Sequence, residues 1–130
     1  MNTIDGVIAV LLDKWVRRLG LTEWEILVSI VDSKKMKKTA ISEVKGCVEY
    51  ELFSHKANIF LLDKLDEIEI EPVIVHELLH LCFSDHDRFY VRIIDYVGDE
   101  AVQELLNKMR TDQVERLLHI ISSSLLREKL

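Results

Sequence analysis

Residues 73–86 read "VIVHELLHLCFSDH", and this stretch decides the fold and the chemistry that the sequence predicts. His76 and His80 are four residues apart, so on a helix they project from one face about one turn apart. Two imidazoles placed in this way can bind one zinc ion at Zn–N distances of about 2.0–2.1 Å. Glu77, next to the first histidine, supplies a carboxylate that can act as a general base on a water at that ion.

The helix that carries these residues is apolar nearly all round, which predicts that it is buried. Its other positions are Val73, Ile74, Val75, Leu78, Leu79 and Leu81. Polar groups in a buried helix are costly unless they are paired or bound to a metal. The alternative is that His76 and His80 are core histidines with hydrogen-bond partners, while Glu77 points to solvent.

His86 is the first candidate for a third zinc ligand. It lies six residues beyond His80, after a stretch where the helix can end and the chain can turn back. The resulting spacing, H-E-x-x-H-x-x-x-x-x-H, is that of three-histidine zinc peptidases. Metzincins have glycine where this chain has Phe83, so the turn geometry must differ here or be strained. The alternative is that His86 is a surface histidine in a loop.

If His86 is not a ligand, a glutamate from a later helix is the second possibility, as in His₂Glu sites. Glu104 and Glu115 are the candidates, and Glu115 is preferred because it lies within a strongly apolar helix. Asp85 or Asp87 would instead orient a ligand imidazole from outside the ligand set. Cys82 is interpreted as a small core residue, because it falls on nearly the opposite helix face from His80.

Before the motif helix, the pattern predicts one helix and a small sheet. Apolar residues at helical spacing extend from about Ile4 to Leu19, and Gly20 follows as a stop. The segment "TEWEILVSIVD" alternates as a half-buried strand does, and residues 33–45 are ambiguous between a short helix and a loop. Two strand-like runs in "GCVEYELFSHKANIFLLD" flank Ser54–Lys56, which predicts a hairpin or a pair of adjacent strands.

Helices are predicted for the rest of the chain. Pro72 favours the first turn of the motif helix, where its missing N–H costs nothing. Later helices are expected at roughly 87–97, 100–109 and 112–126, with breaks at Gly98 and Thr111–Asp112. The prediction is therefore a single α+β domain over residues 1–130, with an N-terminal helix, a small and mostly antiparallel sheet, a buried motif helix and C-terminal helices.

Composition narrows the class of protein. The 130 residues carry a net charge of −6, which argues against nucleic acid as a partner. Two cysteines are too few for a disulfide framework, and no apolar stretch has membrane-spanning length. The first residues, "MNTID", lack the basic region of a secretory signal. A cytoplasmic protein without a membrane partner is the expectation, and the oligomeric state is left open.

The segment "VIVHELLHLCFSDHDRFY" resembles small H-E-x-x-H metallopeptidase-like proteins of the SprT-like and YgjP/WLM types. These have a third histidine after the motif helix and then an aromatic residue, here His86 and Phe89. The wider layout looks like minimal zincin-like proteins of phages and prophages. The resemblance implies a zincin-like fold in which His76, His80 and His86 bind Zn²⁺ and Glu77 is the base.

The sequence departs from these families at several points. The interval from His86 to Phe89 is tighter than in the YgjP/WLM pattern, and the zinc-ribbon cysteines and basic DNA-binding region of SprT-like proteases are missing. The motif also resembles that of YbeY-type endoribonucleases, which lack a glutamate after the first histidine.

The function expected from the motif is that of a zinc-dependent metallopeptidase on peptide or protein substrates, with a zinc-activated water and Glu77 as general base. The alternatives are a non-catalytic, metal-binding zincin-fold interaction module and a YbeY-type metal-dependent endoribonuclease. Tyr50, Tyr90 and Tyr96 are possible oxyanion-stabilising residues, and the sequence gives no reason to prefer one. The strand "ANIFLLD" or its partner "CVEYEL" is a candidate for peptide binding by strand addition.

Overall fold

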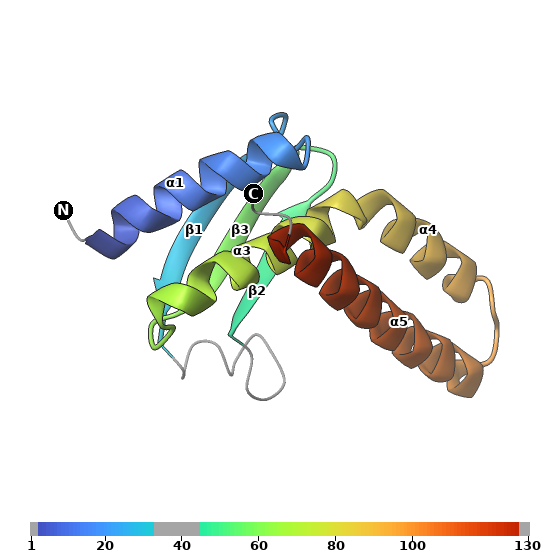
Figure 1. The fold of residues 1–130 in the computed structure, drawn as a ribbon. Helices are drawn as coiled ribbons and strands as arrows, with labels where there is room; N and C mark the ends of the chain where they lie inside the picture. Colours follow the sequence, from blue (N-terminus) through green and yellow to red (C-terminus); the bar gives the residue numbers. More distant parts are fainter. Residues whose placement is uncertain (1–2, 33–44, 128–130) are drawn as a thin grey trace. The chain divides into compact units, whose positions relative to one another are not determined.

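The computed structural model describes residues 3–32 and 45–127 (Figure 1). The elements, in chain order, are α1 (Thr3–Arg18), β1 (Glu25–Val31), β2 (Gly46–Glu51), β3 (Lys56–Leu62), α3 (Glu67–Cys82), α4 (Ser84–Asp95) and α5 (Glu100–Arg127). This order confirms the predicted α+β class with an N-terminal helix, a small sheet and C-terminal helices. The ambiguous segment from Ser33 lies almost wholly outside the described residues.

The chain groups into two compact units, Met1–Cys82 and Phe83–Leu130. The first unit holds α1, the sheet and α3, and the second holds α4 and α5. The prediction of one domain over residues 1–130 stays a prediction. Within the described residues, no helix combines the length and apolar character needed to cross a membrane.

The sheet of the first unit has the strand order β1–β3–β2. β3 pairs antiparallel with β2, which confirms the hairpin, and parallel with β1. The sheet is therefore mixed, and the expectation of a mostly antiparallel sheet holds for one of its two pairings. The hairpin turn contains His55 at φ 53°, a left-handed conformation in which histidine is enriched among non-glycine residues. Its ring stacks on Trp24 with centroids 5.0 Å apart.

One face of the sheet is covered by α1 and α3 (Figure 1). Alternate residues of β3 point into this layer, and Ala57, Ile59 and Leu61 are at most 3% exposed. Ile74 and Leu78 of α3 are fully buried. Each such side chain stabilises the fold by about 1.5–3 kcal/mol relative to leaving it in water. The predicted burial of the motif helix is confirmed, and α3 is fixed as a rigid support for the residues that it carries.

The motif helix begins earlier than the sequence predicted. It starts at Glu67, so Pro72 lies inside the helix and not in its first turn. The stronger start signal is the pair Asp66 and Glu69, in which the Glu69 carboxylate accepts a hydrogen bond from the Asp66 amide at 3.5 Å. A glutamate three positions into a helix commonly reaches back to the preceding backbone in this way. Pro72 then removes one intrahelical hydrogen bond.

The second unit is a pair of helices, α4 and α5, joined across Gly98 as predicted. Asp99 caps α5, because its Oδ1 accepts hydrogen bonds from the amides of Ala101 at 2.9 Å and Val102 at 3.2 Å. The predicted break at Thr111–Asp112 is wrong, since α5 runs unbroken from Glu100 to Arg127. The Thr111 hydroxyl donates to the Asn107 carbonyl at 3.0 Å, so the helix accommodates it without a break.

Candidate metal centre

His76 and His80 lie on adjacent turns of α3 and are both half-buried. Their ring centroids are 5.1 Å apart with an angle of 79° between the ring planes, and each offers a ring nitrogen within 4.8 Å of one on the other. A zinc-bound imidazole has its centroid about 3.2 Å from the ion, so two such rings in tetrahedral geometry have centroids about 5 Å apart. The spacing of the two rings fits a shared zinc ion.

Glu77 lies between the two histidines in sequence and is only 5% exposed. The alternative in which this side chain points to solvent is therefore wrong. Its neighbours along the helix, Leu78 and Leu79, are also buried. A carboxylate held in such surroundings has little rotational freedom, which is what a positioned base requires.

His86 lies in the first turn of α4, in the second unit, and it is exposed. The motif helix ends before it, at Cys82, as predicted. The segment is not a returning loop, however, because Phe83 is a single non-helical residue and the next helix begins at Ser84. Phe83 has φ −97°, which any residue adopts, so no glycine is needed where metzincins have one. The ring of His86 contacts that of Tyr90 at 4.9 Å.

The other predicted ligands also belong to the second unit. Glu104 and Glu115 are exposed residues of α5. Asp87, a candidate for orienting a ligand imidazole, forms an ion pair with Arg110 of α5. The third ligand, whether His86 or a later glutamate such as Glu115, stays a prediction.

Cys82, the last residue of α3, is not the core residue that the sequence predicted. It is exposed, and its Sγ lies 3.9 Å from the Leu19 carbonyl oxygen. The helix face that it occupies is at the end of the packed layer, where burial is incomplete. The partial burial of the thiol raises the pKa of Cys82 above its ordinary value. A thiol with a raised pKa is a poor metal ligand and a poor nucleophile at neutral pH.

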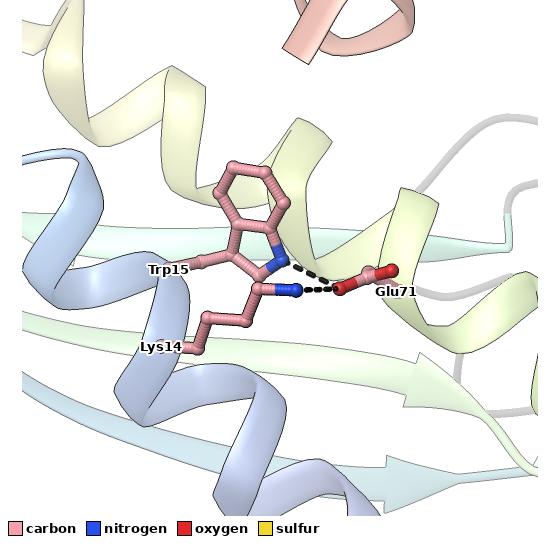
Figure 2. A network of polar contacts seen from close by, with 3 residues as sticks. All are labelled: Lys14, Trp15 and Glu71. Atoms are coloured by element: carbon pink, nitrogen blue, oxygen red, sulfur yellow. Dashed lines mark hydrogen bonds and ion pairs between the residues drawn. The ribbon is translucent and has the colours of Figure 1, made fainter. Parts of the chain in front are cut away.

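A second buried carboxylate of α3, Glu71, was missed by the sequence analysis. Its Oε2 accepts hydrogen bonds from Trp15 Nε1 at 2.8 Å and from Lys14 Nζ at 3.2 Å (Figure 2). Trp15 is 1% exposed and Glu71 is 7% exposed. The contact links α1 to α3 one turn before the histidine pair and so helps to position it. An acidic residue just before an apolar helical run was the available signal, but its partners lie 56 and 57 residues away.

Comparisons with known proteins give no match to this chain among family models, curated proteins or solved structures.

Proposed function

We propose that the protein is a zinc-dependent metallopeptidase. The observation that carries the proposal is the 5.1 Å separation of the His76 and His80 rings on a buried helix, with Glu77 buried between them in sequence. This is the arrangement that an H-E-x-x-H site requires: two ligands on one helical face and a carboxylate beside them.

His76 and His80 would hold the zinc ion, which supplies Lewis acidity to a peptide carbonyl and acidifies a water. Glu77 takes the proton from the attacking water and delivers it to the leaving amine. The apolar packing of α3 keeps the carboxylate in one orientation, so the proton transfer needs little rearrangement. Both His86 and Glu115 remain candidates for the third ligand.

Two strands were candidates for binding a peptide substrate by strand addition, and only one of them lies at an edge of the described sheet. In the described sheet, β3 is hydrogen-bonded to β1 on one side and to β2 on the other, so "ANIFLLD" has no open edge. β2, which contains "CVEYE", is an edge strand. Strand addition along an edge gives main-chain hydrogen bonds that do not depend on the peptide sequence. β2 is therefore the strand that we assign to the substrate, with β3 excluded.

The decisive test is the Glu77→Gln variant, which keeps the shape of the side chain and removes the base. We expect zinc content to be unchanged and hydrolysis of an unstructured protein such as casein to fall by at least about a hundredfold, the scale of general-base catalysis. Glu67→Gln is the matched control, because Glu67 is an exposed glutamate on the same helix. Unchanged hydrolysis in Glu77→Gln would overturn the assignment of the base.

The ligand set is tested by zinc content after dialysis. His76→Ala and His80→Ala should each lose the metal. Of His86→Ala and Glu115→Ala, the variant that loses zinc identifies the third ligand. His119→Ala is the control, since His119 is an exposed histidine on α5. Retention of zinc by His76→Ala and His80→Ala would refute the site.

The same preparations separate the alternatives that the sequence left open. A metal-binding interaction module would hold zinc and hydrolyse no protein in the wild type. An endoribonuclease would cleave RNA, and this cleavage would be lost in His76→Ala.

A further inference from the structure

The second unit contains a cavity of about 210 Å³ between α4 and α5. Polar side chains gather in its wall, namely His86, Asp87 and Tyr90 from α4 and Arg110 and Gln113 from α5. The remaining wall is apolar and includes Val114, Leu117 and Leu118. All of these residues belong to the second unit, so the cavity is complete without any residue of the H-E-x-x-H helix.

Arg110 is the feature of this cavity that points to a ligand. Its Nη1 donates to Oδ1 of Asp87, and its side chain is 21% exposed. Its Nε is buried and has no hydrogen-bond partner in the part of the chain that the structure describes. Buried guanidinium donors are nearly always satisfied, so an orphaned one in a cavity wall indicates an acceptor that enters from outside.

The geometry of a guanidinium defines what that acceptor is. Nε and Nη2 lie on one edge of the planar group, and Nη1 lies on the other side. Asp87 is bonded at Nη1, so this ion pair does not use the Nε–Nη2 edge. This edge donates two parallel hydrogen bonds and matches the two oxygens of a carboxylate.

The charge of the cavity favours a monoanion. Asp87 already balances the charge of Arg110, so a phosphate dianion would meet a carboxylate next to the arginine. The apolar wall gives a substituent of the ligand a place to pack. We infer that this cavity is a binding site for a small monocarboxylate with an apolar body, held by the Nε–Nη2 edge of Arg110.

The test is binding of 3-phenylpropionate to the full chain, followed by calorimetry and by NMR shifts of the α4 and α5 amides. We expect saturable binding of 3-phenylpropionate, with 3-phenylpropionamide and phenyl phosphate each at least about tenfold weaker, because the amide lacks the charge and the phosphate carries too much. Equal binding of the amide or tighter binding of the phosphate would overturn the assignment, and so would no binding of the carboxylate.

Two variants test whether the ligand binds in this cavity. Arg110→Lys keeps the charge and removes the paired donors, so carboxylate affinity should fall about tenfold. Arg116→Lys on the exposed part of α5 is the matched control and should bind as the wild type does. Leu117→Trp fills the apolar end and should abolish binding while leaving Arg110 in place. If Arg110→Lys fails to fold, Leu117→Trp decides the question, and undiminished binding in it refutes the site.

The inference is independent of the proposed peptidase activity, and one measurement keeps them distinct. Carboxylates bind zinc, so the titration is repeated after removal of metal with a chelator. Unchanged affinity supports the Arg110 site. Loss of affinity would assign the carboxylate to the metal, which would refute the Arg110 site and leave the peptidase proposal standing.

Discussion

Glu71 and Glu77 are two buried carboxylates of one helix, and their surroundings differ. Glu71 is held by Trp15 and Lys14 of α1, and these contacts join two elements of the fold. Glu77 follows His76 directly in sequence and precedes His80 by three residues, and the half-buried rings of these histidines are groups that bind metals. The comparison teaches that burial alone does not identify a catalytic carboxylate. The chemistry of its neighbours distinguishes Glu71, which links two helices, from Glu77, the proposed base.

The largest expected effect is on the stability of Glu71→Ala. The change leaves the buried Trp15 Nε1 without this acceptor and removes the partner of Lys14, so the free energy of unfolding should fall by about 3 kcal/mol. Glu77→Gln, which keeps the size and shape of the side chain, should lower it by less than Glu71→Ala does. Urea denaturation measures both, with Glu67→Ala as the exposed control. A larger loss in Glu77→Gln than in Glu71→Ala would break the comparison.

The second effect comes from the metal. At a free zinc concentration about 100 times the dissociation constant, the wild type should gain about 2.7 kcal/mol of stability, because only the folded chain has the site formed. His76→Ala should show no such gain, whereas Glu71→Gln should retain it. Thermal unfolding with and without zinc makes the measurement. Equal gains in the wild type and His76→Ala would show that zinc binds elsewhere.

The third effect is expected from a substitution at Gly46 of β2, which packs against Val73 of α3. A Cβ at Gly46 would lie 2.6 Å from Val73 Cγ1 and 3.0 Å from the Phe60 carbonyl oxygen, so β2 and α3 must separate to accept it. Gly46→Ala should destabilise the protein by about 2 kcal/mol and should also weaken zinc binding. Gly6→Ala is the control, since a Cβ there meets no atom within 4 Å. Full stability in Gly46→Ala would show that the two elements are not tightly packed.

The smallest effect is a pH dependence at the start of α3. The hydrogen bond from Lys45, 2.6 Å from the carboxylate, lowers the pKa of Glu69 below its ordinary value of 4.5. A lowered folded-state pKa gives stability that is present above the unfolded pKa and is lost as the pH falls through the folded one. Glu69→Gln should therefore be less stable than the wild type near neutral pH, with the difference shrinking in acid. A difference that grows in acid would contradict this.

The parts of the fold that depend on local pattern were predictable, whereas those that depend on distant partners were not. The spacing of His76 and His80 and the apolar residues around them predicted a buried motif helix, which is confirmed. The helix begins at Glu67 and not at Pro72, because the Asp66–Glu69 hydrogen bond supports an earlier start and the helix accommodates the proline in its interior. The break predicted at Thr111–Asp112 failed because a weak helix former in a long helix is overruled by its neighbours.

The residues discussed as functional also divide into those that a local sequence pattern predicts and those that depend on distant partners. Glu77 and the histidine pair follow from a motif of five residues. The anchor at Glu71 depends on α1, and the orphaned Nε of Arg110 depends on how α4 and α5 pack. Neither is visible without the tertiary contacts, because the residue types involved occur on any helix surface.

The parallel pairing of β1 with β3 has a consequence during synthesis. Every residue of β1 precedes its β3 partner by 31 positions, and the β2 hairpin lies between them. At elongation rates of about 5–20 residues per second, β1 waits roughly 2–6 s at the ribosome before its partner is made. During this interval Ile26 and Val28, which are half-buried in the folded protein, are open to chaperones and to other nascent chains.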